Sequence, residues 1–193
     1  IKAFTRAVAG VKIHHAFRGG VLEHVSTLME AADQISKLYP FLDRDLLLAG
    51  VFLHDLGKVR EISIEGSFSY TDEGQLLGHI VLILEELETK VSEFVDRTGR
   101  EFDADLLLKL KHLVVSHHGS LDTGSPRVPM TVEAVALHHL DNLDARINEA
   151  MNVINSDPNR QSAWTAFVPR LGRKFYKGRD SGPALTSSGN SEV

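Results

Sequence analysis

The sequence predicts an all-α domain that contains one small β-hairpin. Three observations lead to this prediction: several long segments have apolar residues at every third or fourth position, one short segment alternates, and the 193 residues include no cysteine. The longer spacing is typical of amphipathic helices, and alternation is typical of strands. A chain of this length can bury a sizeable core without disulfides.

The helical spacing occurs in five segments. We expect helices over residues 21–38, 43–53, 73–96, 103–116 and 131–155. The second of these is apolar nearly all round, which is typical of a buried central helix. Asp43 stands where an N-cap is expected, and Gly57 stands where a glycine could end the helix.

The alternating segment covers residues 60–70. Ile62 and Ile64 alternate before the turn 65–67, and Phe68 and Tyr70 alternate after it, so we expect a β-hairpin. Residues 156–177 are less regular. The Gly- and Ser-rich residues 178–193 lack a hydrophobic pattern and are expected to be disordered. We therefore predict one domain over residues 1–177 and a tail over 178–193.

Composition excludes several classes of protein. No apolar run approaches the roughly 18 residues of a membrane span, and no secretory signal opens the chain. We therefore expect a cytoplasmic protein with no membrane contact, and nothing in the sequence fixes its oligomeric state. The lack of cysteine rules out thiolate metal sites. The chain opens at Ile1, which is compatible with a piece of a longer protein.

Charge is unevenly distributed along the chain, whose net charge is −5. Residues 1–18 and 170–179 contain Lys and Arg but no acidic residue. Basic flanks on an acidic body could contact a polyanion such as nucleic acid. The alternative interpretation is ordinary solvated surface charge.

The pair His54-Asp55 is the centre of the candidate site. It follows the most apolar helix, and a buried carboxylate is usually paired or bound to a metal. Each other predicted helix brings further imidazole or carboxylate groups, mostly near its ends. These are His24, His79, His117, His118 and Asp141. Metal sites in helical bundles are assembled in this way.

These ligand types suit a divalent transition metal, namely Mn, Fe, Co, Ni or Zn. Seven candidates exceed the needs of one tetrahedral site, so we expect one or two ions, with Asp55 as the bridge between two. Two ions roughly 3.5–4 Å apart can activate a water and clamp phosphate oxygens. We therefore assign catalysis to Asp55 and Lys58, with activation of the water assigned to the metals.

Two basic residues are candidates for contact with the substrate. Lys58 follows Asp55 by three residues and could neutralise a phosphate oxygen, or it could cap a helix C-terminus. Arg18 could contact phosphate or only solvent.

Five further histidines are interpreted as structural or exposed: His14, His15, His112, His138 and His139. His138 shares a helix face with Asp141 and could orient a ligand. Asp144 competes with Asp141 for the role of ligand.

The order of these residues resembles the H…HD…H…HH…D signature of the HD phosphohydrolase superfamily. His54-Asp55-Leu56-Gly57-Lys58 is similar to its HD-x-GK core. Longer stretches resemble the YhaM-type 3′→5′ exoribonucleases, and the similarity covers roughly residues 11–177. These stretches are residues 14–20, 71–80, 116–119, 124–126, 138–144 and 172–177.

The resemblance implies an HD-domain helical bundle and two metal sites. The first ion would be bound by His24, His54, Asp55 and Asp141. The second would be bound by Asp55, His79, His117 and His118, or one of the last two, His118 in particular, would face the substrate. The family also usually carries an N-terminal OB-fold that binds single-stranded nucleic acid, and this domain is expected to be missing here.

The function that follows is metal-dependent phosphodiester hydrolysis, with RNA or a nucleotide phosphate as the substrate. The HD domain of an exoribonuclease is the first interpretation. A nucleotide phosphohydrolase that acts on small phosphomonoesters is the alternative. A non-catalytic nucleic-acid-binding module that uses the basic flanks is the second alternative, and the complete ligand series argues against it.

Overall fold

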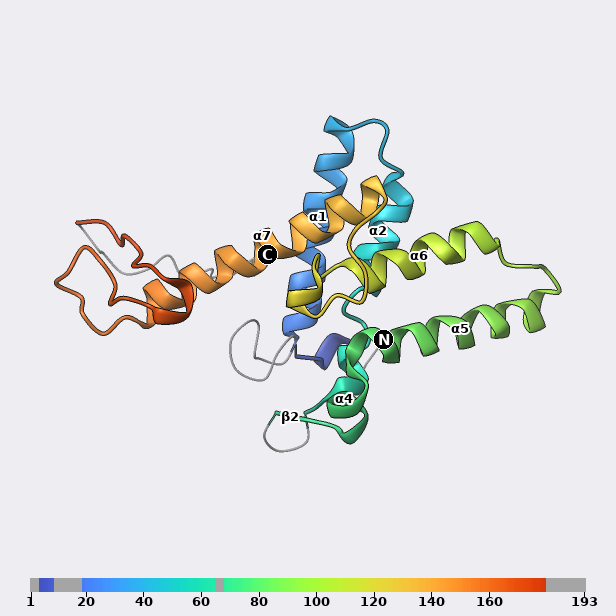
Figure 1. Cartoon of the computed structure of the whole chain (residues 1–193), viewed down its shortest axis with the longest axis horizontal. Coiled ribbons are helices and arrows are strands. Elements are labelled where there is room, and N and C mark those ends of the chain that lie inside the picture. The colour runs from blue at the N-terminus through green and yellow to red at the C-terminus, as the bar shows by residue number, and fades with distance from the viewer. Residues whose placement is uncertain (1–3, 9–18, 65–67, 180–193) are drawn as a thin grey trace, which may run out of the picture. The chain divides into compact units, whose positions relative to one another are not determined.

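The computed structural model describes residues 4–8, 19–64 and 68–179 (Figure 1). The chain divides into two compact units, residues 1–145 and residues 146–193. The predicted domain, residues 1–177, crosses this boundary, and its extent stays a prediction. Arg18 and most of the predicted tail lie outside the described residues.

The first unit is helical, with one hairpin among its described residues. Its helices are α1 (Gly20–Leu38), α2 (Arg44–Leu53), α3 (Lys58–Glu61), α4 (Asp72–Leu76), α5 (Gly78–Thr98), α6 (Ala104–Ser116) and the first part of α7 (Val132–Ser156). Short 3-10 turns are η1 (Phe4–Arg6) and η2 (Leu121–Thr123). The strands β1 (Ile62–Ser63) and β2 (Ser69–Tyr70) pair antiparallel, with Ile62 opposite Tyr70. The predicted fold class is confirmed.

Side chains at the helix starts explain where two of the long helices begin. Oδ1 of Asp43 accepts the backbone N–H of Leu46 at 3.0 Å. Oδ1 of Asp103 accepts the N–H groups of Asp105 at 2.9 Å and Leu106 at 3.1 Å. These caps satisfy donors that no carbonyl of the same helix can reach. The N-cap prediction for Asp43 is confirmed.

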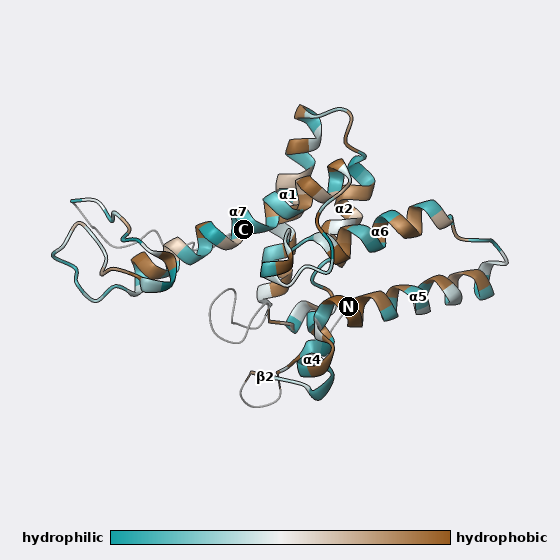
Figure 2. Ribbon diagram, in the orientation of Figure 1, coloured by the Kyte–Doolittle hydropathy of each residue, from teal (hydrophilic) through white to brown (hydrophobic). Residues whose placement is uncertain are grey.

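The core of the first unit lies between α1, α2, α6 and the start of α7. Its side chains are almost fully inaccessible to solvent, among them Val21, Leu28, Leu47, Val51, Leu113 and Leu137. Burial of one such side chain stabilises the fold by about 1.5–3 kcal/mol. In Figure 2 hydrophobic and hydrophilic residues alternate around α5, as expected of a helix with one buried face. This core holds in place the helix ends that carry the candidate ligands.

The predicted helix over residues 73–96 is wrong in one respect, because the structure divides it into α4 and α5. Gly78 has a φ of +74°, a left-handed conformation that interrupts a right-handed helix. Apolar spacing continues across the break, so periodicity alone does not reveal it. The break matters because His79 follows it directly.

The second unit contains the rest of α7 and then an irregular segment, as expected for residues 156–177. Pro169–Leu171 form the short turn η3. Isolated antiparallel bridges join Trp164 to Tyr176 and Val168 to Arg173. None of the helices in the described part of the chain is both long and apolar enough to cross a bilayer.

Candidate metal centre

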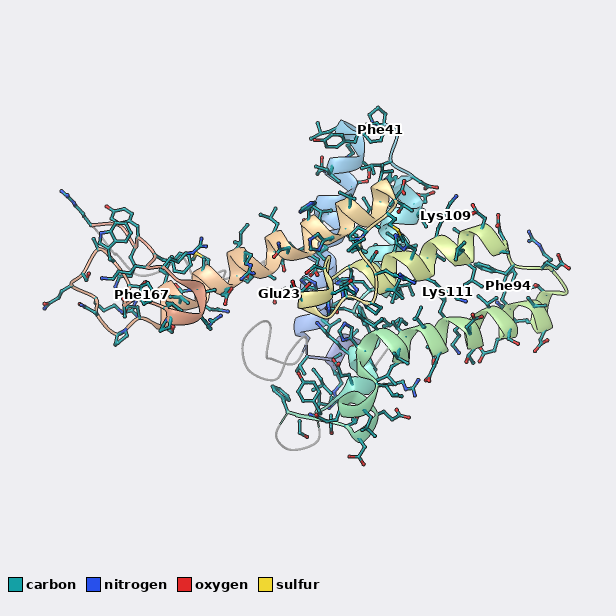
Figure 3. The ribbon with its side chains drawn as sticks, in the orientation of Figure 1. Glu23, Phe41, Phe94, Lys109, Lys111 and Phe167 are labelled. Carbon is teal, nitrogen blue, oxygen red and sulfur yellow. The ribbon has the colours of Figure 1, made fainter. Side chains whose placement is uncertain are left out.

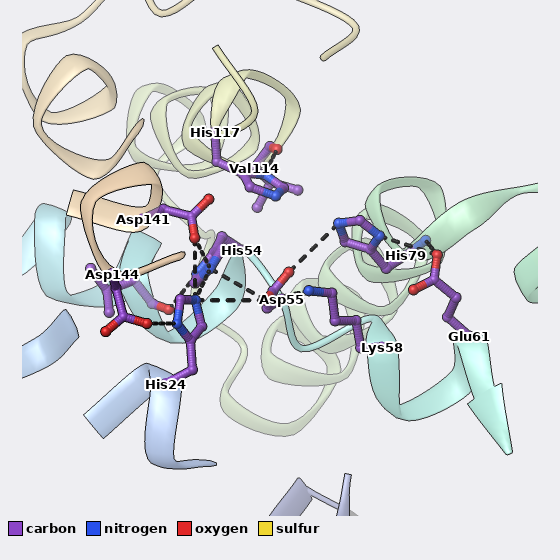
Figure 4. Close-up of polar contacts among 11 residues, drawn as sticks. His24, His54, Asp55, Lys58, Glu61, His79, Val114, His117, Asp141 and Asp144 are labelled. Atoms are coloured by element: carbon purple, nitrogen blue, oxygen red, sulfur yellow. Dashed lines mark hydrogen bonds and ion pairs between the residues drawn. The ribbon is translucent and has the colours of Figure 1, made fainter. Parts of the chain in front are cut away.

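The seven candidate ligands converge in the first unit from five helices. His24 lies on α1, His54 and Asp55 follow α2, His79 is at the start of α5, His117 and His118 follow α6, and Asp141 lies on α7. Figure 4 shows six of the seven together with Lys58, namely His24, His54, Asp55, His79, His117 and Asp141. Residues up to 117 positions apart in the sequence, from His24 to Asp141, thus meet in one site.

The first cluster consists of His24, His54, Asp55 and Asp141. Nε2 of His24 lies 3.3 Å from Nε2 of His54 and 3.3 Å from Oδ1 of Asp141. Nε2 of His54 lies 4.0 Å from the same oxygen of Asp141. Ring nitrogens that face each other at such a distance repel unless a proton or a metal ion lies between them. The cluster is therefore arranged to hold a cation.

The second cluster consists of His79, His117 and His118. One ligand atom from each lies within 4.8 Å of the others. Nε2 of His79, Nε2 of His117 and Nδ1 of His118 are buried and have no hydrogen-bond partner among the described residues. Buried polar atoms of native proteins nearly always have a partner. Three orphaned nitrogens that converge are the arrangement that a metal ion would satisfy.

Asp55 lies between the two clusters. Its Oδ1 is 3.6 Å from Nε2 of His79. Its Oδ2 is 3.6 Å from Nε2 of His54 and 3.8 Å from Nε2 of His24. The two oxygens thus face different histidine groups, which is the geometry expected of a bridging carboxylate.

Two of the histidines are oriented by their own helices. Nδ1 of His54 donates to the carbonyl of Val51, and Nδ1 of His117 donates to the carbonyl of Val114, both at 2.7 Å. A carbonyl can only accept, so Nδ1 carries the hydrogen and Nε2 keeps its lone pair for the site. Partners of this kind fix the ring orientation and tautomer of metal-binding histidines.

Two acidic residues orient two further rings of the site, those of His79 and His24. Oε1 of Glu61 accepts the backbone N–H of His79 at 3.0 Å and lies 3.2 Å from its Nδ1. Oδ2 of Asp144 lies 2.7 Å from Nδ1 of His24. Glu61 was not predicted from the sequence as a residue of the site. Asp144 was predicted only as an alternative ligand to Asp141. Asp144 contacts the far nitrogen of His24, whereas Asp141 contacts the nitrogen that faces the cluster.

Burial keeps three of the histidines neutral. It lowers the pKa of His54, and it lowers the pKa of His117 well below the ordinary value of 6.5. Burial and the neighbouring His79 also lower the pKa of His118. A metal ion binds the neutral imidazole, so these three rings need not lose a proton first.

Asp55 and Lys58 form a buried ion pair. Nζ of Lys58 lies 2.7 Å from Oδ2 of Asp55. Burial opposes ionisation of Asp55, but Lys58 and the surrounding histidines outweigh it and hold its pKa well below 3.8. Burial likewise opposes the charge on Lys58, and Asp55 outweighs it and raises the Lys58 pKa. The hydrogen bond of Lys58 Nζ goes to Asp55, and the alternative role as a helix C-terminal cap stays a prediction.

Asp141 and Asp144 favour the charged form of His24. Burial disfavours the charged ring, but hydrogen bonds to Asp141 and Asp144 outweigh burial and raise the His24 pKa to about 9. Burial also opposes ionisation of Asp141, and the hydrogen bond from His24 keeps the pKa of Asp141 low. The position between these groups thus already favours positive charge.

Gly57 permits the close approach of Asp55 to His79. A Cβ atom on Gly57 would lie 2.1 Å from the carbonyl oxygen of His79, which is part of the backbone. The φ of Gly57 is −60°, an ordinary right-handed value. The helix α2 already ends at Leu53, so the expectation that Gly57 ends it is wrong, and the role of this glycine is to leave room for α5.

Three further histidines, His112, His138 and His139, belong to neither cluster. Nε2 of His112 accepts the backbone N–H of Met130 at 2.9 Å, which is a structural role. Nδ1 of His138 donates to the carbonyl of His117 at 2.8 Å and so supports the second cluster. His139 is exposed. Arg18, His14 and His15 lie outside the described residues.

The donor set fits a divalent transition metal. It contains only imidazole nitrogens and carboxylate oxygens, the ligands preferred by Mn, Fe, Co, Ni and Zn in such sites. Geometry and donor chemistry do not select one of these ions.

Comparison with known proteins agrees with the site. The family model described as "HD domain" matches residues 21–146. Two curated relatives named "3′-5′ exoribonuclease YhaM" are 49% identical over 140 residues (Bacillus subtilis strain 168) and 50% identical over 139 residues (Bacillus velezensis). Each alignment covers 72% of this chain, and it covers 43% and 42% of the respective relative.

A third relative with the same name, from Bacillus licheniformis, is 47% identical over 147 residues, which are 76% of this chain and 45% of the relative. The chain thus spans less than half the length of the curated relatives it matches. No solved structure matches the chain. With these matches and the convergent histidine and aspartate side chains, the chain belongs to the HD-domain family of metal-dependent phosphohydrolases.

Proposed function

We propose that this chain is the nuclease domain of a metal-dependent 3′→5′ exoribonuclease and hydrolyses RNA phosphodiester bonds. The observation that carries the proposal is the position of Asp55, whose two oxygens face two separate groups of histidine nitrogens. The names of the curated relatives support RNA as the substrate.

In this proposal the first cluster holds one ion, and Asp55 with the second cluster holds another. Two bound divalent ions supply Lewis-acid stabilisation of phosphate oxygens and make a nearby water more acidic. Glu61 and Asp144 keep the ring nitrogens of His79 and His24 directed into the site.

Lys58 and His118 are the proposed contacts to the substrate. The side chain of Lys58 is 18% exposed, and its ammonium group pairs with Asp55 at the edge of the two clusters. With the charge of Asp55 balanced by bound metal, that ammonium group would be available to a phosphate oxygen. His118 is the most exposed member of the second cluster, so it is placed to act as a ligand or to contact the scissile phosphate.

Processive degradation, in which the enzyme stays on one strand over many cleavages, is proposed to need more than this domain. An OB-fold ahead of it, expected from the sequence resemblance, would hold the single strand. Arg18 remains a proposed phosphate contact. The proposed place of action is the cytoplasm, where an RNA-degrading enzyme meets its substrate.

The test is hydrolysis by the purified chain after chelation and reloading with Mn²⁺ or Co²⁺. A 5′-labelled single-stranded RNA, bis(p-nitrophenyl) phosphate and a panel of nucleoside monophosphates are the substrates. We expect stepwise shortening of the RNA and cleavage of the diester. Asp55→Asn should abolish both, whereas Asp45→Asn, which changes a 90% exposed carboxylate, should not.

Three outcomes would contradict the proposal. They are no turnover with any divalent ion, turnover that survives Asp55→Asn, and release of inorganic phosphate from monophosphates without diester cleavage. The last would establish the nucleotide phosphohydrolase instead.

A further inference from the structure

The segment that follows α7 differs in charge from the rest of the chain. Residues 158–179 contain six Lys or Arg residues and no Asp or Glu, although the whole chain has a net charge of −5. The HD family model ends at residue 146, so this segment lies beyond the match. The catalytic proposal gives it no role.

The segment folds into a short ribbon of two extended stretches. Trp164 lies opposite Tyr176, and Val168 lies opposite Arg173. Three residues separate the two bridge positions on the first stretch, and two separate them on the second. The first stretch therefore contains a one-residue bulge, a feature that redirects side chains.

Alternation along this ribbon defines an outer face. Exposed and buried positions alternate, with Thr165 buried and Phe175 partly buried between exposed neighbours. Because of the bulge, Phe167 shares the face of Trp164 and Tyr176. The three aromatic side chains are 51%, 55% and 53% exposed for Trp164, Phe167 and Tyr176, respectively. Soluble proteins have little reason to expose three large rings on one small ribbon.

The rings of Trp164 and Tyr176 form the centre of this face. Their centroids are 5.0 Å apart, and the planes are tilted by 59°. The two rings therefore contact each other at an angle, and each ring keeps at least one face that the other does not cover. Phe167 projects from the same unit in Figure 3.

Positive charge accompanies the rings. Arg173 and Lys174 are exposed, and neither forms an ion pair with another described residue. By contrast, Lys177 pairs with Asp157 and Arg170 pairs with Glu149, so those two cations serve the fold of the unit. Alternation places Lys174 on the aromatic face.

We propose that this outer face, formed by Trp164, Phe167, Lys174 and Tyr176 with Arg173 at its edge, binds single-stranded RNA. Bases stack on the exposed rings, and the cations contact phosphates. Aromatic rings interleaved with cations are the usual means of holding single strands without sequence preference. A duplex hides its base faces and fits this surface poorly. An acidic lipid surface would also accept the cations and the exposed Trp and Tyr rings, so the choice of RNA over lipid rests on the proposed nuclease function of the same chain.

This inference deepens the proposed function, on which it rests for the choice of RNA. Its test is binding without metal, so the two proposals can fail separately. Hydrolysis without binding at this face would contradict only the inference. Binding at this face without hydrolysis would contradict only the proposed function.

Trp164 is the sole tryptophan of the chain and serves as the probe. The full chain in EDTA is titrated with a 12-nucleotide oligouridylate, with the same length of RNA duplex, and with vesicles of phosphatidylglycerol and phosphatidylcholine. We expect the single strand to quench Trp164 fluorescence. A labelled oligouridylate gives the Kd independently by anisotropy.

Variants then separate stacking from charge. Trp164→Ala should weaken binding roughly five- to one-hundred-fold, the range for loss of one stacked base, and Trp164→Phe should retain most of the affinity. Arg173→Gln with Lys174→Gln should flatten the dependence of log K on log salt by about 1.4, or 0.7 for each lost phosphate contact. The control variant combines Lys90→Gln and Lys109→Gln, which remove the same amount of charge from exposed positions on α5 and α6. It should change neither the Kd nor the salt dependence of binding.

The inference is overturned by any of four results: no quenching by the single strand, equal quenching by the duplex, quenching by vesicles in place of RNA, or an unchanged Kd in Trp164→Ala. Limited proteolysis of Trp164→Ala and Trp164→Phe checks that the second unit stays folded, because an unfolded unit is cleaved faster than that of the wild type. If Trp164→Ala unfolds the unit, the salt dependence of the double glutamine variant decides.

Discussion

Oε1 of Glu61 accepts the backbone N–H of His79 at 3.0 Å and lies 3.2 Å from Nδ1 of the same residue. One carboxylate oxygen therefore fixes both the start of α5 and the rotation of the ring. The remaining nitrogen, Nε2, is turned towards Oδ1 of Asp55. Burial opposes ionisation of Glu61, but the contacts with His79 outweigh it and lower the Glu61 pKa.

The first prediction concerns this contact. Glu61→Gln keeps one acceptor oxygen and loses the charge that orients the imidazole, so Mn²⁺ affinity should fall about 10- to 100-fold, the range for loss of such a partner. Calorimetric titration of the chelated protein measures it. Glu93→Gln alters an exposed carboxylate that pairs with Lys90 and should leave the affinity unchanged. Equal affinity in both variants would show that His79 does not need Glu61.

The second prediction concerns Gly57. Gly57→Ala should destabilise the fold by about 1–3 kcal/mol, a typical cost of overpacking, because the new methyl group meets the backbone of His79. Gly99 is the control, since no atom lies within 4 Å of its Cβ position and only its φ of +64° opposes alanine. Urea unfolding measures both. If Gly57→Ala loses less free energy of unfolding than Gly99→Ala, α5 can move away from the new methyl group at little cost.

The third prediction concerns Lys58. Lys58→Met should lower kcat for the diester about 10²- to 10³-fold, the usual effect of removing one group that stabilises developing negative charge. Metal binding should not weaken, because the change removes a cation from beside Asp55. Lys58→Arg should recover part of the rate, and Lys90→Met should have no effect. If Lys58→Met loses bound metal to the same extent as it loses activity, Lys58 contributes to metal binding and not to stabilisation of the reacting phosphate.

The fourth prediction concerns metal removal. An ion that binds only the folded state stabilises it by about 2.7 kcal/mol at a concentration of 100 Kd, so Mn²⁺ should raise the Tm and EDTA should reverse the rise. Elemental analysis should give up to two ions per chain. Asp55→Asn should lower the binding of both, because its oxygens face both clusters. Retention of one full-affinity ion would rule out a shared ligand.

The fifth prediction concerns acid stability of the second unit. The hydrogen bond from Lys177 lowers the pKa of Asp157 below 3.8. A lowered carboxylate pKa stabilises the folded state above the ordinary value, and this contribution is lost as the pH falls from 3.8 through the folded value. Trp164 fluorescence should therefore change in that acid range. Asp157→Asn should remove this transition and lower stability near neutral pH. If the acid transition seen in the wild type persists in Asp157→Asn, a group other than Asp157 causes it.

Local sequence signals predicted most of the helices because their causes are local. Asp43 caps α2 through a bond to a residue three positions away, and such bonds depend on nearby sequence alone. The convergence of the candidate ligands was also predictable, since imidazole and carboxylate groups at the ends of apolar helices are costly unless they have partners; their role as metal ligands stays a prediction.

Three features were not predictable because distant residues cause them. Glu61 acts on His79, 18 positions away, and nothing in its own neighbourhood marks it. Gly57 is required by the backbone of α5 and not by its own φ. Alternation over residues 163–177 is interrupted by the bulge, so the ribbon does not show the strict period of a strand. The carbonyl partners of His54 and His117 share one spacing of three residues and could have been anticipated.

The single tryptophan has a consequence for how unfolding of this protein is observed. Trp164 belongs to residues 146–193, whereas most of the helical residues lie in residues 1–145. A fluorescence melt therefore follows the second unit, and far-ultraviolet circular dichroism follows mainly the first. Two-state unfolding requires such probes to coincide. The interval between the two midpoints is then a direct measure of how far the catalytic unit and its C-terminal neighbour unfold as one cooperative body.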